Sequence, residues 1–475
     1  MLPQELYTFQ DRSNTKFIFD PESMAFFLAD EELYRYVSRK GASSNGQVLN
    51  GKSQPTQFRQ IEEILQRERQ RVSQRYSAVS TGMPETLSRL TILTTTACNL
   101  NCTYCYADGG AYGGTVSRLS ASNASTAIRN IAQYYHGIKN IQFFGGEPLL
   151  NPGLIESVCQ DCEAMVARGE LPHLPQFGAT SNGTIWNDRI RDLLKRYQIG
   201  LNISVDGPQD VHDRSRIDAK GRGTYQRVMR TLENLQSEQI PFNIEVTYNI
   251  YSMQAGYSIW DTVEFFADLG IYNPHIVPAS YAPHDPQHWT KQDQEKLVQD
   301  YRDAARRSLK SLQTGQPLLF TYVAGTLSTL LLKIPQPLVC AAGARDLAID
   351  TAGNIYPCFM FVEQDEFLLQ SALKPLDNNE YRYKAHHFFL QNVKEQRNSC
   401  QTCWARSICT GCLGAQQIEN EDLDGKILSC DITQAVAETI ISELAHLQQD
   451  PTEWQQFVAN YRRFRLGQSY VIESC

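Results

Sequence analysis

The middle of the chain, from about residue 88 to residue 330, alternates short apolar runs with longer stretches of mixed polar and apolar residues. The apolar runs predict six strands, which are 90–95, 141–144, a run that ends at 180, 201–205, 243–248 and 275–278. The stretches between them predict helices, for example 120–135, 186–197 and 225–239. Repeated strand–helix units are typical of an α/β fold with a parallel barrel or part of one. In such folds the loops at the carboxyl ends of the strands carry the chemistry.

The first 85 residues have a different pattern and contain no cysteine. Residues 6–9 and 16–20 predict two short strands around a polar turn, and residues 24–38 and 57–78 predict helices. Strands followed by helices in so short a segment favour a small winged-helix-like α+β module. Two interpretations are open: a structural extension that packs on the barrel, or a module that adds an extended peptide to the edge of its sheet.

Composition narrows the function classes. The chain of 475 residues is long enough for two to four domains, and its net charge of −8 gives no reason to expect nucleic-acid binding. It has no apolar run of the roughly 20 residues that a membrane helix needs. The N-terminus lacks a basic segment followed by an apolar one, so we expect a cytoplasmic protein and no membrane partner. The 13 cysteines then indicate metal or redox chemistry rather than disulfides, because the cytoplasm is reducing.

Three cysteines, Cys98, Cys102 and Cys105, follow the first predicted barrel strand with the spacing C-x3-C-x2-C. Three thiolates on one short loop can hold three irons of a [4Fe–4S] cube and leave the fourth iron open to a small molecule. A structural zinc site needs a fourth ligand close by, which this loop does not provide. Three cysteines within eight residues cannot all form disulfides with one another.

With the aromatic Tyr104 before its last cysteine, this spacing resembles the signature of the radical S-adenosylmethionine (SAM) enzymes. The resemblance implies a partial (β/α)6 TIM-like barrel. It also implies that the open iron binds SAM, and that one electron cleaves SAM to methionine and a 5′-deoxyadenosyl radical, which abstracts a hydrogen from the substrate.

The resemblance extends to polar turns after the later strands. Gly145-Gly146-Glu147-Pro148 resembles the family's Gly-Gly-Glu motif, whose glutamate would accept a hydrogen bond from the SAM ammonium group. By position in the family pattern, the other expected SAM contacts are Tyr104, Ser181, Asn182, Ser204, Asp206 and Arg216. An ordinary βα turn is the structural alternative for the glycine motif. A solvated charge cluster is the alternative for Arg216 and its neighbour Arg214.

Seven further cysteines gather near the C-terminus. Their pattern, C-x12-G-x4-C followed by C-x2-C-x5-C-x2-C and a last cysteine, closely resembles the SPASM extension, which binds two auxiliary [4Fe–4S] clusters. One spacing, between Cys409 and Cys412, is a residue shorter than in the family. The resemblance assigns an inner cluster to Cys340, Cys358 and Cys412, and an outer cluster to Cys400, Cys403, Cys409 and Cys430. Two zinc ribbons are the structural alternative.

The inner set has three cysteines, which leaves one iron open. Cys475 or the pair Cys159 and Cys162 are alternative ligands, although that pair lies on a predicted helix and is better explained as core or surface thiols. Phe359 follows Cys358 where the sulfatase-maturating members of the family have an aspartate base. The sequence therefore lacks a carboxylate base at that position.

We interpret the chain as a radical SAM/SPASM maturase with three [4Fe–4S] clusters. The predicted regions are a leader-peptide-binding module (1–85), the radical SAM barrel (86–330), the SPASM domain (331–450) and a C-terminal helix or tail (451–475). The expected substrate is a ribosomally made precursor peptide that gains a carbon–sulfur or carbon–carbon crosslink, with flavodoxin or ferredoxin as external electron donor. The alternatives are a maturase of a quinone-cofactor protein or a sulfatase, a non-catalytic iron–sulfur electron carrier, and a zinc-dependent binding protein.

Overall fold

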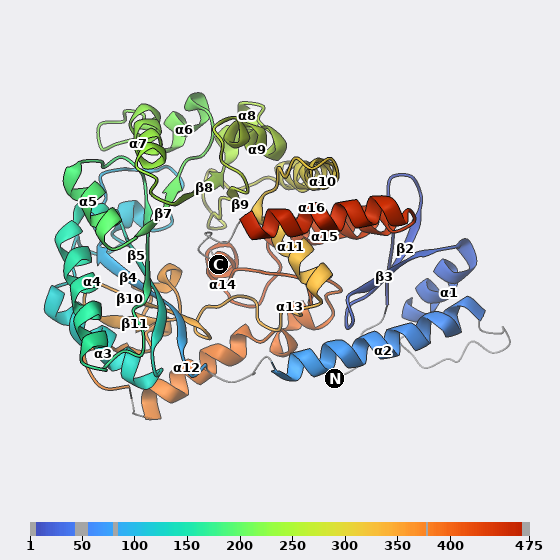
Figure 1. Ribbon diagram of the computed structural model, residues 1–475, viewed down its shortest axis with the longest axis horizontal. Coiled ribbons are helices and arrows are strands. Elements are labelled where there is room, and N and C mark those ends of the chain that lie inside the picture. Colours follow the sequence, from blue (N-terminus) through green and yellow to red (C-terminus); the bar gives the residue numbers. More distant parts are fainter. Residues whose placement is uncertain (1–5, 43–55, 79–83, 377–378, 468–475) are drawn as a thin grey trace.

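The central element of the fold is a sheet of nine strands, seen in a computed structural model that describes residues 6–42, 56–78, 84–376 and 379–467 (Figure 1). Its strand order is β12-β11-β10-β4-β5-β6-β7-β8-β9. The strands of the barrel are all parallel and follow chain order, namely β4 (Leu87–Thr95), β5 (Ile138–Gly145), β6 (Gln176–Ser181), β7 (Gly200–Ser204), β8 (Phe242–Tyr248) and β9 (His275–Pro278). This arrangement confirms the predicted α/β class and the six-stranded partial barrel.

Helices connect these strands and cover the outside of the barrel (Figure 1). Their apolar faces are buried in one large core that runs under the sheet. The helices are α3 (Ala121–Tyr134), α4 (Pro152–Ala167), α5 (Asp188–Arg196), α6 (Gln209–Ser215), α7 (Tyr225–Ser237), α8 (Ile250–Gln254), α9 (Ile259–Asp268), α10 (Lys291–Gln313) and α11 (Thr321–Leu332). None of the helices in the described part of the chain is long and apolar enough to cross a membrane.

The cysteine-rich region extends the same sheet. Strand β10 (Asp346–Ile349) pairs in parallel with β4, and β11 (Asn354–Tyr356) and β12 (Gln370–Ser371) continue the sheet in antiparallel fashion. Helices follow as α12 (Asn379–Asn392), α13 (Asn398–Gln401), α14 (Leu413–Asn420), α15 (Leu428–Leu447) and α16 (Pro451–Gly467). The C-terminal region is therefore joined to the barrel by main-chain hydrogen bonds.

The N-terminal residues form a separate antiparallel sheet of three strands, β1 (Tyr7–Gln10), β2 (Lys16–Asp20) and β3 (Ala25–Ala29), followed by α1 (Glu31–Ala42) and α2 (Thr56–Ala78). The predicted helix over 24–38 is wrong in its first half, because Ala25–Ala29 pairs with β2 along its whole length. The local helix propensity of this segment is outweighed by its pairing with a neighbouring strand. The helix begins only at Glu31.

This module has two apolar faces. One face packs internally, with Ile18 and Phe58 in a small core of their own. The other face places Phe17 and Phe19 in the same core as the barrel. At the contact the Tyr7 ring stacks on Trp404 with centroids 4.2 Å apart, and its hydroxyl donates to Glu438 of α15 at 2.6 Å. The module thus docks on the C-terminal region beside the predicted outer cluster.

We expect Tyr7→Phe to weaken this docking by about 1 kcal/mol, since it removes one hydrogen bond. Tyr7→Ala also removes the stacked ring and should cost about 3 kcal/mol. Limited proteolysis should then release the N-terminal segment faster in the order wild type, Tyr7→Phe, Tyr7→Ala. Tyr34→Ala, a change in the same module outside the stack, is the control. Equal cleavage rates in the wild type and both Tyr7 variants would contradict the docking role.

Candidate active site

The three cysteines of the signature lie on the loop that follows β4, which we call the cysteine loop (residues 96–106). The thiols of Cys98, Cys102 and Cys105 are close enough to interact electrostatically with one another. Burial raises the pKa of the Cys102 thiol to about 12 and also raises that of Cys98, although the Leu100 N–H group lowers the latter. Burial thus disfavours both thiolates, and an iron cluster would supply the positive charge that favours them.

The Gly-Gly-Glu turn after β5 fixes the backbone of this loop. Gly146 N–H donates to the Thr95 carbonyl at 2.9 Å, and Glu147 N–H donates to the Ala97 carbonyl at 2.8 Å. A Cβ atom on Gly145 would lie 2.1 Å from the Thr95 oxygen, and one on Gly146 would lie 2.3 Å from the Ala97 oxygen. The glycines are required because two main chains approach here, in addition to any contact with a ligand.

Glu147 is fully buried, and its carboxylate is already occupied by the protein's own groups. It accepts hydrogen bonds from Leu149 N–H at 3.0 Å, from the Ser181 hydroxyl at 2.9 Å and from Asn182 N–H at 2.7 Å. Burial raises its pKa to about 7 against the lowering effect of these donors. Glu147 thus ties the turn after β5 to the turn after β6, and a contact with SAM stays a prediction.

A second cluster of polar side chains is centred on Asp206, which follows β7. It accepts hydrogen bonds from the Tyr104 hydroxyl at 2.6 Å and from Arg216 Nε at 3.0 Å, and Arg216 also lies 5.5 Å from the Tyr104 ring. Arg214 is exposed and lies over the ring of Tyr251 at 4.7 Å. The structure therefore brings Arg216 to the cysteine loop and directs Arg214 away from it.

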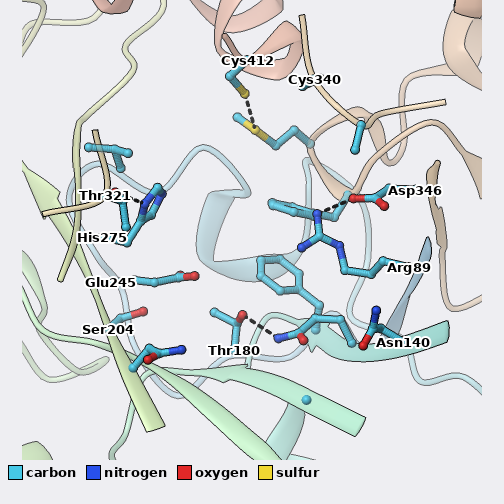
Figure 2. Close-up of a pocket in the computed structure, with 18 of the residues that line it drawn as sticks. Arg89, Asn140, Thr180, Ser204, Glu245, His275, Thr321, Cys340, Asp346 and Cys412 are labelled. Carbon is cyan, nitrogen blue, oxygen red and sulfur yellow. Dashed lines mark hydrogen bonds and ion pairs between the residues drawn. The ribbon is translucent and has the colours of Figure 1, made fainter. Parts of the chain in front are cut away.

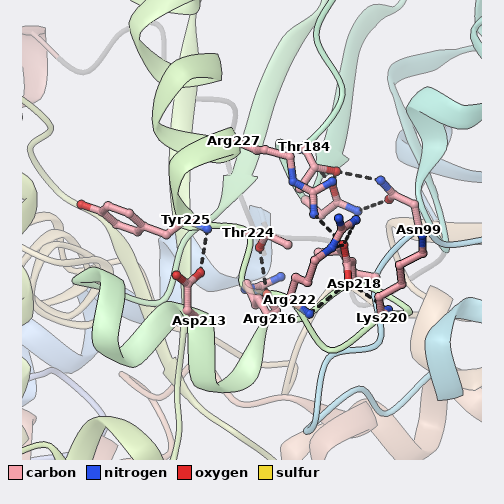
Figure 3. Close-up of polar contacts among 12 residues, drawn as sticks. Asn99, Thr184, Asp213, Arg216, Asp218, Lys220, Arg222, Thr224, Tyr225 and Arg227 are labelled. Atoms are coloured by element: carbon pink, nitrogen blue, oxygen red, sulfur yellow. Dashed lines mark hydrogen bonds and ion pairs between the residues drawn. The ribbon is translucent and has the colours of Figure 1, made fainter.

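Main-chain hydrogen bonds also connect the segment around Arg216 to the cysteine loop. Asn101 N–H donates to the Ile217 carbonyl at 2.7 Å, and Thr103 N–H donates to the Ser215 carbonyl at 3.0 Å. On the other side of the loop, Asn182 donates to the Asn99 side chain at 2.8 Å, and Asn99 in turn donates to Thr184 at 2.8 Å (Figure 3). The expected residues after β6 and β7 thus surround the cysteine loop.

A cavity of about 2380 Å³ opens inside the barrel. All three cysteines of the loop line it, together with Gly145, Gly146, Ser181, Asn182, Ser204 and Arg216 of the expected SAM contacts. Cys340 and Cys412 of the inner cysteine set line the same cavity (Figure 2). Single small-molecule pockets are typically about 300–1,000 Å³, so this cavity has room for SAM and a segment of a larger substrate.

Several polar residues of the cavity wall carry no sequence signature. Glu245 and His275 are register partners on β8 and β9, and both face the cavity (Figure 2). Burial raises the pKa of Glu245 and lowers that of His275 to about 4. Arg89 of β4 pairs with Asp346 of β10 across the sheet. Only the alternation of residues along each strand could have indicated which of them point inward.

The inner cysteine set (Cys340, Cys358 and Cys412) lies at the β10–β11 hairpin. Cys340 precedes β10 and Cys358 follows β11, while the N–H groups of Ala342 and Leu413 donate to the Cys340 thiol. Cys412 (Figure 2) is the N-cap of α14, and its sulfur lies 3.7 Å from the thioether of Met360. Cys475, one alternative ligand, lies outside the described residues.

The outer cysteine set (Cys400, Cys403, Cys409 and Cys430) forms a second group. The thiol of Cys430 interacts electrostatically with each of the other three thiols. Hydrogen bonds reach these sulfurs, among them one from Gln434 to Cys403 at 3.4 Å and one from the Thr433 hydroxyl to Cys409. This set is not among the residues that line the cavity.

The pair Cys159 and Cys162 is fully buried in α4, which confirms that these are core thiols. Within the described ranges, no three His, Cys, Asp or Glu side chains could hold a single metal ion. A [4Fe–4S] cube makes a different demand, because each cysteine binds a separate iron.

Comparison with known proteins gives the class. Residues 92–269 match the Radical SAM superfamily, so this segment is a radical SAM domain. Such a domain implies SAM and a [4Fe–4S] cluster. The cysteine loop fits that cluster, since its three thiols share one cavity with the glycine turn and Arg216.

Individual relatives give a more detailed picture of what the chain is similar to. Sporulation killing factor maturation protein SkfB of Bacillus subtilis is 30% identical over 184 residues, which are 38% of this chain and 40% of SkfB. Uncharacterized protein MJ0907 of Methanocaldococcus jannaschii is 32% identical over 34% of this chain and 53% of that protein. The chain thus spans about half or less of the length of these two. A cysteine-type anaerobic sulfatase-maturating enzyme of Clostridium perfringens strain 13 is 21% identical over 71% of this chain and 91% of the enzyme.

Two solved structures share the fold. The native enzyme anSMEcpe with bound AdoMet superposes with a TM-score of 0.62 at 17% identity, covering 75% of this chain and 99% of that chain. Streptococcus suis SuiB bound to S-adenosylmethionine gives 0.52 at 15% identity, covering 90% of this chain and 98% of that one. The barrel with its C-terminal extension is therefore an architecture known among SAM-binding proteins.

We expect Glu147→Ala to lower the free energy of unfolding by about 3 kcal/mol, because three buried donors lose their acceptor. Urea unfolding of the cluster-free protein measures the change. Glu170→Ala is the matched control, since Glu170 pairs with Arg168 and Arg129 in partly exposed ion pairs, and it should have the smaller effect. Equal effects of the two substitutions would show that Glu147 does not hold the two turns together.

Proposed function

We propose that this protein is a radical SAM/SPASM peptide maturase that installs an intramolecular crosslink in a ribosomally made precursor peptide. The observation that carries the proposal is the shared cavity, which both the cysteine loop and the inner cysteine set line. A peptide segment in that cavity would lie between the place where a hydrogen is abstracted and a second iron–sulfur site. The crosslink would be carbon–sulfur or carbon–carbon.

The ligand sets follow from the same arrangement. The cysteine loop would hold the SAM-binding cluster, and the inner and outer cysteine sets would hold two auxiliary clusters. When bound, SAM and its cluster supply the radical that abstracts the hydrogen. The chain's own residues hold the site: Asp206 fixes Tyr104 and Arg216, the glycine turn fixes the cysteine loop, and the surrounding barrel excludes bulk water.

The position after Cys358 distinguishes this chain from a sulfatase-type enzyme. Phe359 packs against Phe144 with ring centroids 4.4 Å apart, so an aromatic pair occupies that part of the cavity wall. Position 359 therefore provides no carboxylate that could act as a base. The similarity to sulfatase-maturating enzymes over most of their length keeps protein-substrate maturation as the second candidate. A carbonyl-reactive hydrazine probe separates the two, because formylglycine carries an aldehyde and a crosslink does not, whereas oxidation of a serine and formation of a crosslink both lose two hydrogens.

The substrate class rests on a relative and on the N-terminal module. SkfB is named for the maturation of a killing factor, which supports a peptide substrate here. The module presents a three-stranded sheet whose outer strands, β1 and β3, each pair with only one strand. An edge strand can accept an extended peptide through main-chain hydrogen bonds. We assign leader binding to the edge formed by β3 (residues 25–29). We assign electron supply to flavodoxin or ferredoxin.

We expect anaerobic reconstitution to give three clusters, on the order of twelve irons per chain. Replacing the three cysteines of the loop by alanine should remove about four irons and abolish SAM cleavage, because the proposed SAM-binding cluster then loses all of its protein ligands. Iron analysis and detection of 5′-deoxyadenosine provide the measurements, with Cys159→Ala as a cysteine control. Retained cleavage in the triple variant would refute the ligand assignment.

We also expect a photoreactive group in the leader of a precursor peptide to crosslink to the module, at or beside residues 25–29. This test uses the whole chain, because removing the module would uncover the apolar surface on which Phe17 and Phe19 pack. Mass spectrometry of the digested adduct maps the site, and a peptide without its leader is the control. Labelling confined to the barrel would assign the module a purely structural role.

A further inference from the structure

A lysine without a carboxylate partner lies beside the outer cysteine set. Lys394 is 2% exposed and precedes Cys400 by six residues. Its ammonium group donates to three main-chain carbonyls, those of Gln336 at 2.8 Å, Arg406 at 2.9 Å and Cys409 at 2.5 Å. An ammonium has three hydrogens and no lone pair, so three acceptors match its charged form completely.

The groups that face this nitrogen are unusual for a buried lysine. Two of its three acceptors belong to the segment 406–409, which leads into the outer cysteine set. Burial lowers the pKa of Lys394, the sulfurs of Cys409, Cys400 and Cys403 act to raise it, and the nearby cation Arg406 lowers it further. Buried charges are normally paired, and no carboxylate of the described residues forms a salt bridge with Lys394, so the anionic site beside it is the one that these cysteines would form.

A second buried cation nearby shows the contrast. Arg397, also 2% exposed, donates to the Gln391 carbonyl at 2.7 Å and to the Gln416 side chain at 2.8 Å. Its guanidinium has Asp424 at 3.9 Å as a carboxylate partner. The charge of Arg397 is therefore compensated locally by a carboxylate, whereas that of Lys394 meets main-chain carbonyls, one of which belongs to the ligand Cys409.

We propose that Lys394 is a positioning residue whose fixed positive charge raises the reduction potential of the outer auxiliary cluster. This inference rests on the proposed ligand set. Reduction adds one electron to a cluster that four thiolates already make anionic, and a neighbouring positive charge stabilises that added negative charge. The outer cluster would then be an acceptor for an electron that leaves the cavity, and it would not touch the substrate.

This electrostatic role differs from a purely structural one, which we call a structural staple, in which the hydrogen bonds of Lys394 hold three segments of the chain together. A staple requires the hydrogen bonds and the volume of the side chain, while the potential depends on its charge. Lys394→Met and Lys394→Gln remove the charge, and Lys394→Arg keeps it. Lys384→Met removes a partly exposed lysine that pairs with Glu380 at 3.1 Å on α12, and it serves as the matched control.

The experiment is a redox titration, followed by electron paramagnetic resonance, of the full chain reconstituted anaerobically. The signal of the outer cluster is identified by its loss when the four cysteines of the outer set are replaced by alanine. Without Lys394's charge, we expect the ratio of reduced to oxidised outer cluster at a fixed potential to fall about tenfold, which is about 59 mV for one electron. Lys394→Arg and Lys384→Met should leave it unchanged.

An unchanged ratio in a neutral variant that retains the cluster would overturn the proposal. If both neutral variants lose the outer cluster and Lys394→Arg keeps it at the original potential, the requirement is for charge, which supports the proposal. Loss of the cluster from all three Lys394 variants would overturn it in favour of a structural staple. If the four-cysteine variant loses no iron, the ligand assignment fails instead.

Discussion

Two main chains meet at the junction between the cysteine loop and the glycine turn, and the site depends on that contact. The turn after β5 donates two N–H groups to the carbonyls of Thr95 and Ala97, at distances that leave no room for a Cβ atom. From there Glu147 connects the turn to β6, and the segment 215–217 fixes the far side of the loop. Each strand end thus holds the next, and the three thiols take their positions from the sheet.

The parts of this arrangement that sequence could predict are those with a local signature. Strand β9 was predicted at its observed bounds, because apolar runs and turn residues are adjacent in the chain. The family resemblance also assigned the outer cysteine set, whose thiols interact electrostatically in the structure. Strand β3 was missed, since its partner β2 lies outside any local window and decides its conformation. Lys394 and Glu245 were missed because their neighbours in space are far away in sequence.

The charged and ionisable side chains beside the cavity differ from those beside the outer cysteine set. The cavity wall carries ionisable groups such as Glu245 and His275, whereas the outer cysteine set lies outside the cavity, beside the buried Lys394. Chemistry on a substrate needs room to bind, and a fixed positive charge stabilises an added electron. One chain therefore contains two different electrostatic environments.

The β10–β11 hairpin is hydrogen-bonded to β4 over Asp346–Ile349, and β4 leads directly into the cysteine loop. The cysteine loop and two cysteines of the inner set, Cys340 and Cys358, therefore flank neighbouring strands of one continuous sheet. Under the proposed function, the sheet would fix the distance between the two sites. That distance would then limit how many residues of a bound peptide can separate the two positions that are joined.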